Sequence, residues 1–215
     1  MNGIHEVTIP DVLRMGWCGP DGYLSEGRGD GLPIVAMTYG NRKDALGQIT
    51  AGPTNDQIAG ATIAVARAAD VPVYAQHEVA LAMRLAGKPA SRPVMRNTDT
   101  EGYIDTPTMA HAVASDLRAR GEEPVVDLAA HYRHIGRCVY EFNQAGITIA
   151  HYITGLPKKF DHQSNEIWTA GSAIWDAHEV CACAILAVRS RLPGAADFIR
   201  QSVVKAKHLK TRSAQ

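Results

Sequence analysis

The sequence lacks an excess of charge of either sign. Lysine and arginine together number 22 and aspartate and glutamate also number 22, so the formal net charge of the 215-residue chain is +0. A protein that binds nucleic acid needs a basic footprint to neutralise phosphates, so we expect no nucleic-acid partner. Balanced charge also removes one barrier to self-association, which keeps a homo-oligomer among the expected states.

Long apolar runs and a secretory leader are missing as well. No uncharged apolar stretch is long enough to span a bilayer. Residues 1–30 are polar and glycine-rich, without the apolar core of a signal peptide. These absences predict a cytoplasmic protein with no membrane anchor.

Cysteine is sparse, and its spacing argues against a disulfide framework. The chain has four cysteines. Cys181 and Cys183 stand two apart in a helical pattern, so their side chains would point away from each other. This predicts reduced, mostly buried thiols in a reducing compartment. No ligand spacing joins His77, His131 and His134 into a zinc set, so no metal is expected.

Apolar runs alternate with helical patterns along most of the chain. The runs predict strands over residues 32–39, 71–75, 93–96, 124–130 and 147–153. Strands that alternate with helices favour a three-layer α/β fold with a mostly parallel sheet of about five strands. We expect one such domain over residues 31–204, a basic tail over 205–215, and an irregular arm over 1–30 with a short helix near 10–15.

Hydroxyl side chains mark three of the expected helix starts. Thr54, followed three residues later by Gln57, predicts a capping box. Thr106 before Pro107 has the preferred order of N-cap and first helical residue. Ser164 is expected to cap a long final helix.

The loop after the first strand has the glycine spacing of a phosphate-binding P-loop. It runs from Gly47 to Thr54, but Pro53 stands where the lysine of a P-loop must be. Proline also removes a backbone donor, so nucleotide hydrolysis on a P-loop is excluded. Two alternatives remain: an anion held at the start of the following helix, or an ordinary surface loop.

His134 and Arg137 form the pattern with the clearest chemical content, because they lie one helical turn apart after the strand at 124–130. Open α/β sheets bind ligands at the carboxyl ends of their strands. Arg137 offers bidentate donors for a carboxylate or phosphate, and His134 can act as a general acid or base. His131 and Arg133 occupy the same turn. The alternatives are a solvated polar turn for those two and a capping role for His134.

Two more polar segments are expected at the same edge of the sheet. Asp105, Thr106 and Thr108 stand at a helix start, where an anionic ligand group could be held. Capping accounts for Thr106, whereas Asp105 is a candidate to orient a histidine or to bind a ligand hydroxyl or amine. Gln76 and His77 follow the second strand and would face the same ligand.

The strand followed by His134-x-x-Arg137, Phe142 and Ala145-Gly146 resembles the YdcF, SanA and ElyC family of vancomycin high-temperature exclusion and envelope-biogenesis-like proteins. The run from Asp105 to Ala110 resembles the segment that opens a helix in that family. The resemblance covers residues 33–155 by pattern order. It implies a Rossmann-like three-layer fold with a cleft at the strand carboxyl ends and, through one branch of the family, S-adenosylmethionine as a ligand.

Several pocket positions depart from the family pattern. Asp105 replaces an asparagine, Thr108 replaces an acidic residue and His131 replaces a small hydroxyl residue. The run from Thr38 to Asn41 replaces a glycine-rich run, and Gln76-His77 replaces a glycine pair. We therefore expect a retained framework with a changed pocket lining. The expected ligand-binding residues are Gly40, Asn41, Gln76, His77, Thr106, Thr108, His131 and Arg133.

These observations together favour a soluble α/β enzyme, a transferase or hydrolase, that acts on a small anionic or nucleotide-like ligand. Its expected catalytic residues are His134 for proton transfer, Arg137 to hold the anion and Asp105 to orient the histidine or the ligand. Two alternatives stay open. One is a non-catalytic module that binds S-adenosylmethionine or a nucleotide, and the other is an accessory protein of envelope-polysaccharide metabolism.

Overall fold

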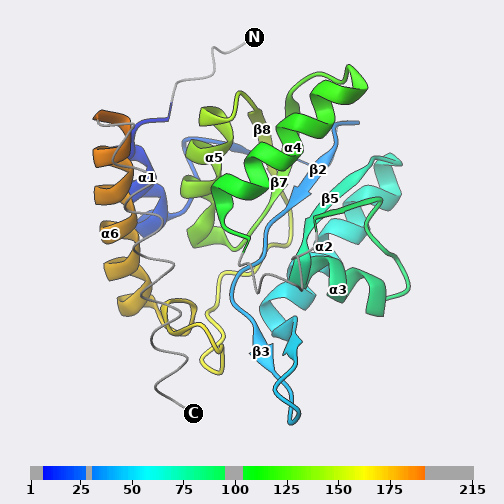
Figure 1. Cartoon of the computed structure of the whole chain (residues 1–215), viewed down its shortest axis with the longest axis horizontal. Coiled ribbons are helices and arrows are strands. Elements are labelled where there is room, and N and C mark those ends of the chain that lie inside the picture. The colour runs from blue at the N-terminus through cyan, green and yellow to red at the C-terminus, as the bar shows by residue number, and fades with distance from the viewer. Residues whose placement is uncertain (1–6, 28–30, 95–103, 192–215) are drawn as a thin grey trace.

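A parallel β-sheet between two layers of helices forms the centre of the molecule (Figure 1). The computed structural model describes residues 7–27, 31–94 and 104–191. The sheet is six-stranded and all of its pairs are parallel, so the fold is α/β and Rossmann-like, as predicted. Its strands are β1 (Ser25–Gly27), β2 (Ile34–Ala36), β5 (Val73–Gln76), β6 (Arg92–Val94), β7 (Val125–Ala129) and β8 (Thr148–Ile153).

The strand order is β1-β8-β7-β2-β5-β6. After β1 at one edge, the chain crosses to β2 near the middle, moves outward through β5 to β6, and then returns to the other side of β2 with β7 and β8. The direction of winding therefore reverses between β2 and β7. In open α/β sheets, ligands bind in the crevice at the carboxyl ends of the strands beside such a switch point.

The described part of the chain has six α-helices around the sheet. They are α1 (Ile9–Cys18), α2 (Gly52–Ala69), α3 (His77–Leu85), α4 (Thr106–Arg120), α5 (Ile135–Gln144) and α6 (Ser172–Arg191). Helices α2 and α3 pack together on one face, and α4, α5 and α1 cover the other (Figure 1). Helix α6 packs on α1, outside that second layer. Fully buried side chains such as Ile34, Leu128 and Phe142 fill the core.

The N-terminal segment contains the short helix expected near residues 10–15 and, in addition, a strand. Helix α1 spans ten residues and begins with a capping box, in which Thr8 and Asp11 satisfy each other's backbone groups. Strand β1 extends the sheet beside β8, with Glu26 opposite Tyr152. The segment therefore contributes one strand that the apolar pattern did not indicate. The expected tail over residues 205–215 lies outside the described residues.

Two of the expected capping roles are wrong in register. Asp105, not Thr106, caps α4, and its carboxylate accepts a hydrogen bond from the Thr108 backbone N–H at 2.9 Å. Helix α2 begins two residues before Thr54, which is buried within the first turn. Each difference arises because a stretch with several cap-forming residues allows more than one start, and packing selects among them.

The expected cap of the last helix is also wrong. Ser164 lies eight residues before the start of α6. Its hydroxyl contacts the Thr169 hydroxyl at 2.7 Å and the Asn41 carbonyl at 3.3 Å, so it belongs to a loop held against the segment that follows β2. A short 3-10 helix, η3 (Ile167–Thr169), lies between this loop and α6.

The glycine-containing loop after β2 forms a small antiparallel hairpin, β3 (Arg42–Lys43) with β4 (Ile49–Thr50). Asp44 closes its turn by accepting hydrogen bonds from the backbone of Leu46 and Gln48. The carboxylate of Asp161 forms a bidentate pair with Arg42, at 2.8 and 2.7 Å. A Cβ added to Gly52, the first residue of α2, would lie 3.4 Å from that carboxylate. The protein's own acidic group thus stands beside this helix start.

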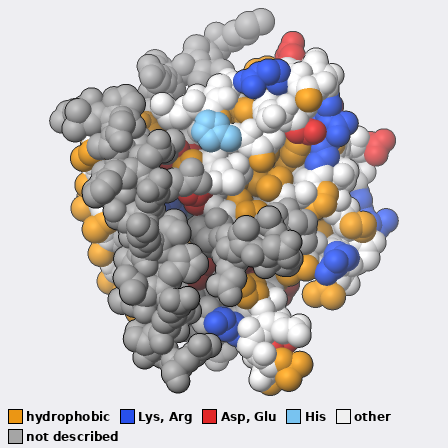
Figure 2. Space-filling model, viewed as in Figure 1, with side chains coloured by type: hydrophobic (Ala, Val, Ile, Leu, Met, Phe, Trp, Pro, Cys, Tyr) orange, Lys and Arg blue, Asp and Glu red, His pale blue; other side chains and the backbone are white. Residues whose placement is uncertain are grey.

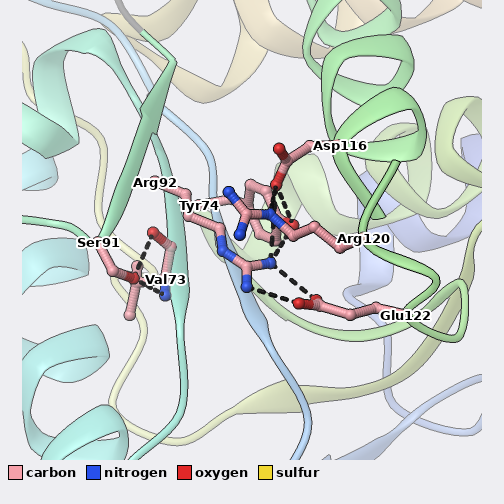
Figure 3. Close-up of polar contacts among 7 residues, drawn as sticks. All are labelled: Val73, Tyr74, Ser91, Arg92, Asp116, Arg120 and Glu122. Atoms are coloured by element: carbon pink, nitrogen blue, oxygen red, sulfur yellow. Dashed lines mark hydrogen bonds and ion pairs between the residues drawn. The ribbon is translucent and has the colours of Figure 1, made fainter. Parts of the chain in front are cut away.

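The edge strand β6 is fixed by a polar network on the face covered by α4 (Figure 3). Arg92 donates two hydrogen bonds to Glu122, at 2.8 and 2.7 Å, and one to the Tyr74 hydroxyl. Asp116 of α4 accepts hydrogen bonds from that hydroxyl and from Arg120, both at 2.8 Å. The network connects two strands to the C-terminal part of α4.

All four cysteines are free, as expected from their spacing. Cys138 and Cys183 are buried, whereas Cys18 and Cys181 are exposed, so burial holds for only two of them. None of the helices in the described part of the chain has the length and apolar character needed to cross a membrane.

Candidate functional site

Aromatic and imidazole rings meet over the switch point between β2 and β7. Tyr39 follows β2 and His131 follows β7, and their rings are stacked with centroids 4.0 Å apart and planes within 11°. Phe160 packs on the His131 ring at 5.1 Å, and Trp175 of α6 packs on the Tyr39 ring at 4.8 Å. We call Tyr39, His131, His134, Phe160 and Trp175 the ring cluster. It occupies the position where sheets of this topology bind ligands.

His131 is fully buried and both of its ring nitrogens contact the backbone. Nδ1 accepts from the Arg133 N–H, and Nε2 lies 3.3 Å from the Lys159 carbonyl, which can only accept. The proton therefore resides on Nε2. Burial lowers the pKa of His131 to about 4, so the ring is neutral at physiological pH. Through these contacts His131 positions its neighbours. The predicted contact between His131 and a ligand stays a prediction.

His134 and Arg137 do lie together, as the sequence predicts. Arg137 Nη2 approaches His134 Nδ1 at 3.2 Å. A guanidinium can only donate, so Nδ1 accepts and the imidazole carries its proton on Nε2. Burial and the nearby Arg137 charge hold the pKa of His134 well below its ordinary value. His134 is thus a neutral hydrogen-bond donor in this arrangement.

Helix α6 closes the site with two side chains. Glu179, only 1% exposed, lies 3.3 Å from Arg137 Nη1. The Trp175 ring lies 5.3 Å from the guanidinium carbon, within cation–π range. His134 also meets the edge of Trp175, at 5.6 Å. Arg137 is therefore held between the histidine, an aromatic face and a buried carboxylate.

Several buried donors around this site have no hydrogen-bond partner among the described residues. They are the hydroxyls of Thr38 and Tyr39 and the indole N–H of Trp175. Burial raises the pKa of the Tyr39 hydroxyl well above its usual value, so that group keeps its proton. Buried polar groups in folded proteins nearly always have a partner, so such a group calls for a water or a ligand.

Side chains of β5 and α2 hold the turn after β2 in place. The Thr38 N–H donates to Gln76 Oε1 at 2.9 Å, and Gln76 Nε2 donates to the Ile104 carbonyl at 2.6 Å. Asn55 of α2 holds the other side, because it accepts from the Tyr39 N–H and donates to the Gly40 carbonyl, both at 2.8 Å. Gln76, an expected ligand-binding residue, is thus engaged in shaping the turn.

Gly40 and Asn41 face the loop that precedes α6. Gly40 has a φ of +70°, and a Cβ there would lie 2.5 Å from the Thr169 hydroxyl oxygen. Only glycine fits such a position without strain. Asn41 Nδ2 donates to Glu166 at 2.8 Å, and Asn41 Oδ1 is buried with no hydrogen-bond partner in the described residues.

The remaining sequence-predicted residues have other surroundings. Arg133 donates hydrogen bonds to the Gly16 carbonyl of α1 and to Asp176 of α6. Asp105 caps α4, and Thr106 and Thr108 lie in the first turn of that helix. His77 is the first residue of α3 and is half-buried. Their predicted ligand contacts stay predictions.

The sequence-based reasoning missed Tyr39, Trp175 and Glu179. Tyr39 ends an apolar run, so the sequence predicts it as the last residue of the strand, although a buried aromatic residue next to a switch point is a candidate for a site. Trp175 and Glu179 are one helical turn apart on α6, which is a spacing that places them on one face. This spacing is the only local feature that indicates a role for Trp175 and Glu179, because their partners, Arg137 and the ring cluster, lie far away in the sequence.

A shallow open groove of about 470 Å³ lies apart from the ring cluster. It is lined by Glu26, Ala64, Val65, Ala68 and Thr154. No group of three or more histidine, cysteine, aspartate or glutamate side chains within residues 7–27, 31–94 and 104–191 is arranged to hold a metal ion.

Comparison with known proteins gives no family assignment, since no family model, curated protein or solved structure matches the chain. The resemblance to the YdcF, SanA and ElyC family therefore stays an expectation that rests on the motifs named above.

Proposed function

We propose that this chain is an α/β enzyme that acts on a small anionic or nucleotide-like ligand at the carboxyl ends of β2 and β7. The observation that carries the proposal is the set of hydrogen-bond donors at the switch point. His134 is a neutral donor through Nε2 beside Arg137, and the buried hydroxyls of Thr38 and Tyr39 and the indole N–H of Trp175 have no hydrogen-bond partner among the described residues. A donor-rich site suits a ligand rich in acceptors, such as a carboxylate or phosphate.

His134 would donate a hydrogen bond to a ligand oxygen. Its Nδ1 is engaged by Arg137, so the neutral imidazole polarises the ligand through Nε2–H. Neutral histidines can stabilise negative charge that develops on a substrate oxygen in this way. Proton transfer through Nδ1 requires Arg137 to release that nitrogen, which binding of an anion to the guanidinium would favour.

Glu179 is the internal counter-charge that a ligand anion would replace. Its carboxylate is buried and lies 3.3 Å from Arg137 Nη1, yet neither of its oxygens has a hydrogen bond of good geometry in the described residues. In an ion pair with poor geometry, the attraction between the charges offsets little of the free energy needed to remove them from water. A ligand carboxylate or phosphate that approaches in bidentate geometry can therefore compete for the guanidinium.

The experiment removes this counter-charge. Glu179→Gln should raise the affinity for AMP or inorganic phosphate about tenfold, or ~1.4 kcal/mol, because Arg137 loses its competitor. Asp176→Asn is the matched control, since Asp176 is the other acid of α6 and pairs with Arg133. Isothermal calorimetry gives the affinities. If neither probe binds the wild type or Glu179→Gln, the proposal fails.

A non-catalytic binding module is the second candidate. The observation in its favour is the engagement of His134 Nδ1 by Arg137, which suits hydrogen-bond donation better than proton transfer. Mass spectrometry of wild-type protein incubated with AMP or S-adenosylmethionine separates the two functions. Product that disappears in His134→Ala supports the enzyme, whereas saturable binding without product supports the module.

A further inference from the structure

Helix α6 has two faces of opposite character. Its inward face carries Trp175, Glu179, Cys183 and Leu186, each no more than 5% exposed. Both acids of the helix are engaged inward, Asp176 with Arg133 and Glu179 with Arg137. No aspartate, glutamate, lysine or arginine therefore remains on the outward face between residues 172 and 188.

The outward face carries a continuous apolar stripe. It consists of Ile174, Ala177, Cys181, Ala184 and Val188, all of them exposed. The steps between these residues are three, four, three and four, which is the heptad spacing of helices that pair along their length. Over these residues the stripe is ~20 Å long at 1.5 Å per residue. Val180 and Ile185, at 46% and 40% exposure, flank it.

Exposed apolar side chains concentrate around this helix. The described residues include nine large hydrophobic side chains that are exposed, and four of them lie on α6. Two more, Trp17 and Ile167, lie on α1 and η3, the elements packed against α6. Figure 2 shows hydrophobic side chains along the left edge of the molecule, where Figure 1 places α6. Contiguous exposed apolar patches of this kind mark interaction surfaces.

We infer that this chain forms a two-fold symmetric homodimer through the outward face of α6. In such a dimer each face meets its own copy, so a face with charge of one sign would repel itself. The stripe carries no charge, and heptad spacing is compatible with packing against an identical helix. Cys181 is the middle residue of the stripe, so a two-fold axis that bisects the stripe brings the two Cys181 side chains together.

This dimer does not depend on the proposed function, but it would affect the same helix. The inward face of α6 supplies Trp175 and Glu179 to the ring cluster and Arg137. A partner helix on the outward face would restrict the motion of α6 and thereby hold those side chains in place.

The first test is the mass of the intact chain in solution. Sedimentation equilibrium should give twice the 23.2 kDa of the chain at micromolar concentration. Cys181→Glu should weaken the dimer at least a hundredfold, since it places two like charges together at the axis. Val188→Glu should weaken it to a similar degree, since it buries a charge against an apolar side chain of the second copy. Leu85→Glu, on α3 and 83% exposed, is the control and should leave the dimer unchanged. Far-UV circular dichroism checks that each variant is folded.

A second test uses the two exposed cysteines. A short bis-maleimide should link two wild-type chains through Cys181, and Cys181→Ser should abolish the link, whereas Cys18→Ser should not. A wild-type chain that is monomeric at 100 µM overturns the inference. So does a dimer that survives both glutamate substitutions, or one that is linked through Cys18, because its interface would lie elsewhere.

Discussion

At the scale of single residues, two histidines three positions apart have different roles because their ring nitrogens meet different partners. His131 contacts backbone groups through both nitrogens and stacks on Tyr39. His134 contacts Arg137 through one nitrogen only. Sequence spacing places both after β7 but gives no information about which nitrogen is engaged. Contacts with distant parts of the chain decide which of the two is available to a ligand.

Burial of neutral His131 predicts a loss of stability in mild acid. Its pKa is about 4 in the folded protein and close to 6.5 when unfolded, so the unfolded chain binds the extra proton first. The stabilising contribution is complete above pH 6.5 and is lost as the pH falls toward 4, by up to ~3 kcal/mol. We expect His131→Phe, which keeps an aromatic ring beside Tyr39, to have a smaller change in unfolding free energy over this range.

The measurement is urea unfolding of both proteins at pH 7, 6 and 5. Carboxylates with lowered pKa, such as that of Asp161, also lose stability in acid, but they do so equally in both proteins. For each protein, the unfolding free energy is plotted against pH. The difference between the two slopes is therefore the contribution of His131. Parallel slopes would show that His131 is not buried in its neutral form.

At the scale of elements, the strands of the sheet interior could be predicted and the boundaries of the helices could not. The runs that became β2, β7 and β8 are apolar because helices cover both faces of the sheet. Strand β1 has only three residues, two of them exposed, and depends on the edge of β8 for its pairing. Local preference also allows several helix starts near Thr106, and tertiary contacts select Asp105 as the cap.

The Arg92 network predicts which contact secures the edge strand β6. Arg92→Met should lower the unfolding free energy by about 2 kcal/mol, because Glu122 and the Tyr74 hydroxyl lose a charged donor. Arg120→Met is the control; Arg120 is half exposed and bonds Asp116 within the same helix, so its loss should cost less than ~0.5 kcal/mol. Chemical denaturation gives both values. Equal effects would contradict a special role for Arg92.

At the scale of the whole molecule, the candidate site is assembled from segments that are far apart in the sequence. Tyr39, His134 and Glu179 lie on three different segments and meet only because β2 and β7 are neighbours and α6 packs over them. The pair His134 and Arg137 could be recognised because it is local. Its partners could not, since nothing near residue 179 in the sequence indicates an arginine at 137.

The N-terminal segment should be indispensable to the folded domain. Val12 and Met15 of α1 are fully buried, and Gly136 allows α1 to approach α5 so closely that a Cβ there would lie 2.7 Å from Met15 Cβ. Deletion of residues 1–27 removes these contacts and uncovers the edge of β8, which then invites aggregation. The truncated chain should lose more than ~5 kcal/mol of unfolding free energy, a large part of the stability of a typical domain.

Thermal unfolding and light scattering measure the effect of the deletion. Arg14→Ala, a substitution at an exposed position of α1, is the control and should lower the unfolding free energy by less than ~0.5 kcal/mol. A truncated chain that unfolds at the temperature of the full chain would show that this segment is an appendage.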